Sequence, residues 1–155
     1  MYLQRKFKNF FMAAQFDSKH GIVSRPKSEI YMAFTDMRNF LQMLPEDKKQ
    51  GVTADFDSIT ASVQGFNIGV RVANRVPYSK IELEDNGAPF KFHVTLNCED
   101  TPDPNKTDFS INVEADLNMM MRMMVGGKVK EALDKIVDGL VDVSEGRMPE
   151  GMPKV

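Results

Sequence analysis

Between residues 52 and 117, apolar and polar residues alternate through six consecutive segments. A period of two is typical of strands with one buried face and one solvent face. Short polar links join the segments, which favours antiparallel neighbours in a meander. The expected inward positions are Val52, Ala54 and Phe56; Ile59, Ala61 and Val63; Ile68, Val70 and Val72; Ile81 and Leu83; Phe90, Phe92, Val94, Leu96 and Cys98; and Phe109, Ile111, Val113, Ala115 and Leu117.

The period changes after residue 117. Apolar residues then recur at spacings of three and four as far as residue 144, which predicts one long amphipathic helix over 118–144. Such a helix runs about 40 Å at 1.5 Å per residue and is long enough to cover a sheet. Its predicted apolar stripe comprises Leu117, Met120, Met121, Met124, Val129, Ala132, Leu133, Ile136, Val137, Leu140 and Val141.

The N-terminal part predicts a first strand over 16–25, ended by Pro26, and a short helix with Ser28 as its N-cap. A second short helix is expected over 37–44. Residues 1–15 are basic and aromatic and are interpreted as a loosely ordered extension, with an amphipathic helix on a membrane or partner as the alternative. The domain itself is predicted over 16–144, and residues 145–155 are predicted to form a flexible tail.

The order of strand, two short helices, six-stranded meander and long helix resembles the START-like superfamily, also called SRPBCC. The resemblance rests on SRPKSEIYMAFTDMRNF at residues 24–40, on DFDSITASVQGFNIGVRVANRVPYSKIEL at residues 55–83, and on the Met-rich opening of the last helix. Its members include Bet v 1-type and polyketide cyclase-type proteins, and the chain looks closest to small bacterial members. The resemblance implies an α+β helix-grip fold (β-α-α-β6-α), in which a curved antiparallel sheet of about seven strands wraps a long C-terminal helix. It also implies an apolar cavity between sheet and helix.

Composition narrows the function classes. The 155 residues are 42% hydrophobic and 27% charged, with no apolar run near the ~20 residues that span a bilayer, so an integral membrane segment is not expected. A net charge of −2 gives no electrostatic basis for binding nucleic acid. One cysteine and two histidines offer neither a disulfide nor a metal cluster, and no cofactor is expected. A reducing, cytoplasmic location follows as the default. Oligomeric state is left open.

Methionine is the compositional signal for a binding site. Five of the 12 methionines fall in residues 119–124, followed by Gly126 and Gly127. Flexible, polarisable side chains suit the wall of an adaptable cavity, and ordinary core packing is the equal alternative. The predicted ligand-lining residues are Phe34, Met37, Phe40, Phe66, Val72, Asn74, Phe92, Met120, Met121 and Met124.

Evidence for catalysis is weak. Asn74 interrupts an inward series and either orients a ligand or marks a bulge. His20 shares the parity of Phe16 and Ile22 and is interpreted as structural. No Ser/His/Asp set, phosphate loop or metal spacing appears. The sequence therefore predicts a non-catalytic binder of an apolar small molecule, a lipid or an aromatic metabolite. A cyclase or aromatase, or an interaction module with a collapsed cavity, are the alternatives.

Overall fold

One antiparallel sheet and a long C-terminal helix dominate the structure, a computed structural model that describes residues 14–63, 66–88 and 90–147, apart from the side chains of Met43, Val63 and Phe66. The strands are β1 (Ala14–Asp17), β2 (Gly21–Val23), β3 (Val52–Ala54), β4 (Ser58–Val63), β5 (Phe66–Val76), β6 (Lys80–Asp85), β7 (Phe92–Asp100) and β8 (Thr107–Ala115). The helices are α2 (Lys27–Phe34), α3 (Arg38–Met43), the 3-10 turn η1 (Glu46–Lys48) and α4 (Met119–Ser144).

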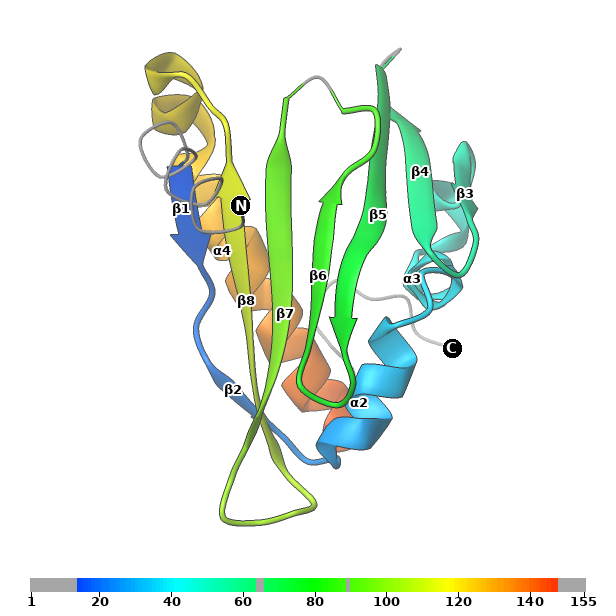
Figure 1. Ribbon diagram of the computed structural model, residues 1–155, viewed down its shortest axis with the longest axis vertical. Helices are drawn as coiled ribbons and strands as arrows, with labels where there is room; N and C mark the ends of the chain where they lie inside the picture. Colours follow the sequence, from blue (N-terminus) through cyan, green and yellow to red (C-terminus); the bar gives the residue numbers. More distant parts are fainter. Residues whose placement is uncertain (1–13, 64–65, 89, 148–155) are drawn as a thin grey trace.

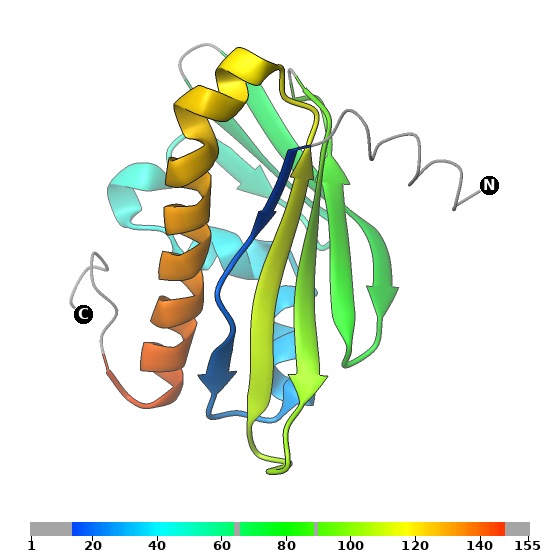
Figure 2. The same cartoon turned by 90° about the vertical axis from the view of Figure 1, so that its left-hand side faces the viewer.

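The sheet is an open meander closed at one edge by the N-terminal strands. Its order is β1-β8-β7-β6-β5-β4-β3, with β2 also paired to β8 (Figure 1). All six strands predicted from the alternation are present, and the sheet curves around α4 (Figure 2). The predicted α+β helix-grip fold is confirmed, with eight strands because the first predicted strand is divided in two.

Ser18 explains that division. Its backbone N–H donates to the carbonyl of Ile111, and its hydroxyl accepts from the N–H of Ile111, both at 2.8 Å. The side chain thus replaces one backbone partner in the ladder with β8, and the chain leaves strand geometry until Gly21. Strand structure begins at Ala14, two residues before the predicted start at residue 16. The predicted extension over 1–15 therefore overlaps β1, and its residues 1–13 lie outside the described part of the chain.

The helix termini follow partly from local chemistry. The amide oxygen of Asn118 accepts from the N–H of Met121 at 2.8 Å, an N-cap that sets the start of α4 as predicted. The predicted N-cap at Ser28 is wrong. Pro26, extended at ψ 149°, precedes α2, and the helix begins at Lys27 without a side-chain cap. The carbonyl of Pro26 accepts from the N–H groups of Glu29 and Ile30 at 3.0 and 3.3 Å, so the first turn closes on this residue without a capping hydroxyl.

The three helices cover different parts of the inner face of the sheet. α4 lies against β1, β2 and β8, α2 lies against β6 and β7, and α3 lies against β3 and β4. The stripe of α4 that packs inward contains Met121, Val125, Val129, Leu133 and Val137, spaced by four. Ala132 and Ile136, which were predicted to share it, are exposed. Each is one position from a stripe residue, and one position turns a side chain by about 100° around the helix.

Candidate ligand site on the inner face of the sheet

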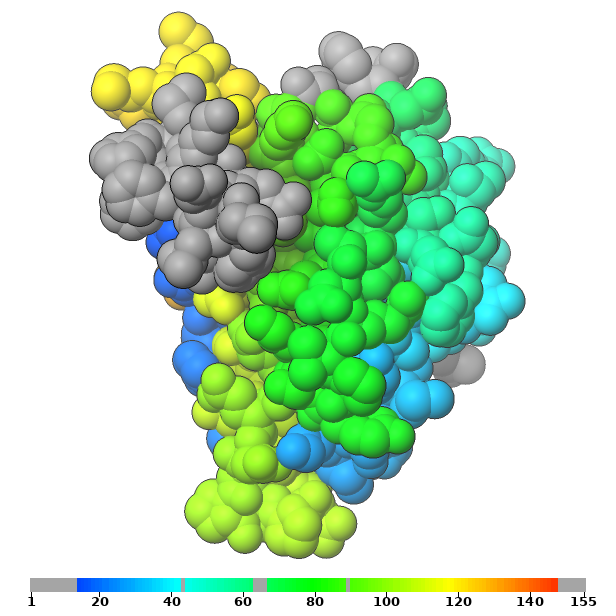
Figure 3. Space-filling view, in the orientation of Figure 1, coloured from blue at the N-terminus to red at the C-terminus, as the bar shows by residue number. Residues whose placement is uncertain are grey.

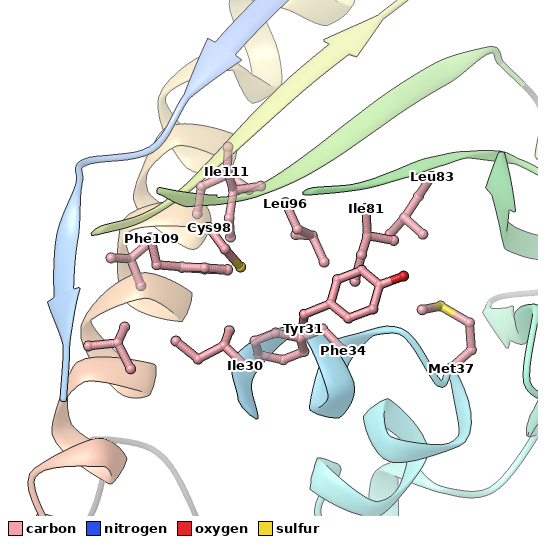
Figure 4. Packing of buried hydrophobic residues seen from close by; sticks show 13 residues of the cluster. Ile30, Tyr31, Phe34, Met37, Ile81, Leu83, Leu96, Cys98, Phe109 and Ile111 are labelled. Atoms are coloured by element: carbon pink, nitrogen blue, oxygen red, sulfur yellow. The ribbon is translucent and has the colours of Figure 1, made fainter. Parts of the chain in front are cut away.

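The lower half of the inner face, beside α2, is fully packed. Ile81, Leu96 and Ile111 stand opposite one another on β6, β7 and β8, and each is at most 7% exposed. Figure 4 shows these side chains directed toward Ile30 and Phe34 of α2. Little apolar surface in this row is accessible to water.

The next row, one step toward the start of α4, is incompletely covered. Val72, Leu83, Val94, Val113 and Phe16 follow one another across β5, β6, β7, β8 and β1. Leu83 is buried, but the other four are only partly buried. Val70 on β5 and Phe92 on β7 continue the same face and are also partly buried. We call Phe16, Val70, Val72, Phe92, Val94 and Val113 the upper inner face.

The placement of the helices explains why the lower row is buried and the upper row is only partly buried. α4 covers one edge of the sheet and α3 the other, while α2 covers the lower ends of the central strands (Figures 1 and 2). The upper parts of β5, β6 and β7 lie between these helices. The side chains that these strands turn inward are apolar and only partly buried, so apolar surface remains accessible here.

The structure distributes the predicted lining residues unevenly. Val72 and Phe92 lie on the upper inner face. Phe34 and Met37 are core residues: Met37 is completely buried, and Phe34 stacks between Phe40 and Phe109 at ring distances of 5.3 and 5.7 Å. Phe40 is partly buried beside them.

The methionines of α4 divide between its two sides. Met121 packs against Ala14, Ala115 and Leu117 at the upper end of the inner face. Met120 and Met124, also predicted as lining residues, are instead 71% and 68% exposed. They precede the inward residues Met121 and Val125 by one position, which rotates them away from the packed stripe. The side chain of Phe66, the remaining apolar candidate, lies outside the described part of the chain.

Asn74 marks a bulge and is not on the inner face. The ladder between β5 and β6 shifts between Val72 and Asn74, so Asn74 pairs with Glu82 and Arg75 pairs with Ile81. The exposed Asn74 amide donates to Oε2 of Glu82 at 2.9 Å. The bulge, one of the two readings of this residue, is the one observed. One extra residue on one strand reverses the faces beyond it.

Sequence reasoning missed Arg75, which the bulge turns inward. Its guanidinium donates to the hydroxyl and the carbonyl of Thr35 at 2.7 and 2.8 Å, to the carbonyl of Phe56 at 3.2 Å and to the carboxylate of Asp57 at 2.9 Å. It also lies 4.3 Å from the centre of the Phe56 ring. Phe56, predicted to be inward, is 44% exposed beneath it. The interruption of the apolar series at Asn74 allowed a bulge, but it did not identify Arg75 as the residue that turns inward.

Asp85 is a second missed polar residue. It lies at the upper end of β6, on the same face as Ile81 and Leu83. Its Oδ1 accepts from the N–H of Phe92 at 3.0 Å. The alternation alone would have identified it. Because its carboxylate closes the turn between β6 and β7, it serves as a structural acceptor.

Neither Cys98 nor His20 is placed as a reactive group on the inner face. Burial raises the pKa of the Cys98 thiol to about 11, so the thiol stays protonated and unreactive at neutral pH. His20, interpreted as structural, is exposed on the outside and its Nδ1 lies 2.8 Å from Oδ1 of Asp108.

His20, Glu99 and Asp108 form one group whose ligating atoms all lie within 4.8 Å of one another. Asp108 stands opposite Glu99 in the ladder between β7 and β8, so tertiary pairing creates a cluster that spacing did not predict. Three such ligands have the chemistry to hold a divalent transition metal. His20 and Glu99 are exposed, and the His20–Asp108 contact is also an ordinary surface pair.

Solved structures share this architecture. A Thermobifida fusca protein superposes with a TM-score of 0.66 at 9% identity, over 90% of this chain and 97% of that one. A Staphylococcus epidermidis protein gives 0.61 at 16% identity, over 93% and 96%. The chain has a START-like fold. A Thalictrum norcoclaurine synthase mutant, in complex with a transition-state analogue, also gives 0.61 at 10% identity, over 86% and 95%.

The likeness is one of structure, since neither a protein-family model nor a curated protein sequence matches the chain. The described part of the chain includes no helix that is both long and apolar enough to cross a membrane.

Proposed function

We propose that this START-like protein binds an apolar small molecule, a lipid or an aromatic metabolite, on the upper inner face without transforming it. One observation carries the proposal. Val94 and Val113 occupy the same face of the same strands as the buried Leu96 and Ile111, and Val72 continues that face on β5, opposite Leu83. All three valines nevertheless remain partly exposed. A ligand that covers this surface gains roughly 25 cal/mol of binding free energy per Å² of apolar area removed from water.

The polar groups on the inner side of the sheet favour binding over catalysis. The guanidinium of Arg75, beside the lower row, donates to Thr35, Phe56 and Asp57, and Asp85, at the upper end of β6, accepts from a backbone N–H. A general acid or base needs a partner that tunes it and a free path to the substrate. Neither residue is placed for that task. The structural similarity to norcoclaurine synthase, whose structure contains a transition-state analogue, supports a fold that accommodates a bound molecule.

Native mass spectrometry of protein purified from its own host, followed by organic extraction, tests the proposal directly. A co-purifying apolar molecule is expected. Binding of the neutral fluorescent probe N-phenyl-1-naphthylamine then locates the site. The variant Val94→Trp fills the upper inner face and is expected to weaken probe binding about tenfold or more, because the probe and the indole need the same space.

The neighbouring residue provides a matched control. Thr95 stands opposite Glu82 and Asn112 on the outer face, so Thr95→Trp adds the same ring where no probe is expected. Equal loss of binding in both variants, or no probe binding by the wild type together with a bare native mass, contradicts the proposal.

A further inference from the structure

The first two turns of α4 carry an exposed apolar cluster that the ligand site does not use. Met119, Met120, Met123 and Met124 are 78%, 71%, 82% and 68% exposed. We call these four residues the methionine tip. Single exposed apolar residues are ordinary, but four long apolar side chains within two turns mark a surface that meets another apolar phase.

The position of the methionine tip favours a flat partner. The start of α4 stands at an upper corner of the molecule in Figures 1 and 2, and its side chains project there in the space-filling view of Figure 3. A projecting helix corner inserts into an interface without any rearrangement of the sheet. Flexible methionine side chains also adapt to an irregular, fluid surface.

The charged residues near the methionine tip indicate the kind of surface that it would bind. The segment from Leu117 to Lys130 contains Arg122, Lys128 and Lys130 and no acidic residue, although the whole chain has a net charge of −2. Lys130 lies furthest from the tip and pairs with Asp134 at 3.2 Å, so the positive charge nearest the methionines comes from Arg122 and Lys128. Residues 1–13, which lie outside the described part of the chain, are likewise basic without an acidic residue. Basic residues that flank an exposed apolar face are complementary to negatively charged lipid headgroups.

The glycine pair gives this corner a way to adjust. A Cβ added at Gly127 would meet nothing, and one at Gly126 would make only an ordinary contact, 3.6 Å from Cε1 of Phe16. Packing among the described residues therefore does not require either glycine. Two adjacent glycines weaken the helix locally, so the first turns can tilt relative to the rest of α4.

We infer that the methionine tip docks this protein on the surface of a negatively charged lipid bilayer. The inference does not require a ligand on the upper inner face. Flotation of the full chain with phosphatidylcholine vesicles containing about a quarter phosphatidylglycerol is expected to recover bound protein, and less so as salt is raised. Vesicles of phosphatidylcholine alone are expected to recover little.

Two matched variants decide whether the tip is responsible. Met123→Glu is expected to reduce binding to the anionic vesicles about fivefold or more, because it places a carboxylate in the interface. Met32→Glu makes the same change at a methionine on α2 that is 59% exposed, and is expected to bind as the wild type does. Both sites are exposed, so both variants are expected to fold.

Three outcomes overturn the inference: no binding of the wild type to anionic vesicles, undiminished binding by Met123→Glu, or a dimer in sedimentation velocity that Met123→Glu abolishes. The last assigns the tip to a second copy of the chain. Probe binding in the absence of vesicles is measured in parallel. It reports on the ligand site alone, so failure of docking and failure of the proposed function are distinguished.

Discussion

Nε of Arg75 donates a hydrogen bond to the hydroxyl of Thr35 at 2.7 Å, although 40 positions separate the two residues in the chain. The same guanidinium reaches the loop before β4 through Phe56 and Asp57. One side chain therefore joins the end of α2 to the opposite edge of the sheet. This contact ties the end of α2 to the loop between β3 and β4 beside the lower core.

Replacing Arg75 tests this link. Arg75→Met is expected to lower the free energy of unfolding by about 2 kcal/mol, because several charge-assisted hydrogen bonds are lost while Thr35 stays buried. Arg75→Lys is expected to recover only part of this loss, since an ammonium group lacks the planar fork of donors. Urea unfolding followed by circular dichroism measures both.

Arg71 on the same strand provides the control for that experiment. Its side chain is 55% exposed and pairs with Glu84 at 3.2 Å on the outer face. Arg71→Met is expected to change stability by less than about 1 kcal/mol. Equal effects at the two positions would mean that Arg75 is an ordinary surface residue.

Replacement of glycine by alanine is expected to change the stability of the protein in opposite directions in the sheet and in the helix. Gly127→Ala adds a methyl group in open space within a helix and is expected to stabilise the protein by up to about 1 kcal/mol. Gly69→Ala brings a Cβ against the backbone carbonyl of Asn86 and is expected to destabilise it by more than about 1 kcal/mol. Thermal unfolding midpoints of the two variants check the signs. A destabilised Gly127→Ala protein would show that the helix needs this glycine.

Because the thiol of Cys98 is buried, we expect the stability of the protein to change at alkaline pH. Its thiol has a pKa of about 11 in the folded chain, raised by burial from 9.0. A raised folded pKa contributes stability that is present below pH 9 and lost as the pH rises toward 11. The free energy of unfolding of the wild type should therefore fall by about 2–3 kcal/mol relative to Cys98→Ala over this range.

Thiol labelling provides an independent check on Cys98. At pH 8, modification by a disulfide reagent is expected to be at least about tenfold slower in the folded than in the urea-unfolded protein, because both the thiolate fraction and access are reduced. Equal rates would contradict the buried, protonated state.

Because the pKa of the Asp134 carboxyl is lowered, we expect the protein to lose stability at acid pH. The backbone N–H of Lys19, which donates to Oδ1 at 2.6 Å, lowers the pKa of this carboxyl, and Lys130 adds to the effect. A lowered folded pKa contributes stability that is present above the unfolded pKa and lost as the pH falls through the folded one.

Asp134→Ala is accordingly expected to lower the urea midpoint at neutral pH. Its difference from the wild type should shrink in acid. Asp138→Ala removes only the exposed contact with Nζ of Lys19 and is expected to have little effect. A difference from the wild type that is independent of pH would show that Asp134 acts through packing and not through charge.

Much of the fold was predictable because its signals are local. The alternation from Val52 to Leu117 predicts six strands, and short links restrict them to antiparallel neighbours. The period of three to four that follows predicts the long helix over 118–144, which the structure shows as α4 (Met119–Ser144). Each of these signals depends on a repeat that neighbouring residues carry together, so one irregular position does not remove it.

The candidate site was predicted only in part, because it depends on which face each residue takes. Val72 and Phe92 follow the strand parity and lie where expected. Asn74 and Arg75 exchange faces at a bulge. The break in the alternation at Asn74 allowed a bulge but left a contact with a ligand open as the alternative, and the strand pairing decided between them. The division of the first strand likewise depends on Ser18 meeting Ile111, a partner 93 residues away.

The sequence by itself determined the elements, their order and the apolar character of one sheet face and one helix stripe. Tertiary structure decided which of those apolar residues are covered. Met121 packs inward and Met120 lies in solvent because the crossing of α4 over β1, β2 and β8 selects a narrow face from a stripe that was apolar over a wider arc. Periodicity reports that a side chain can be buried, whereas burial itself requires a neighbour supplied by a distant part of the chain.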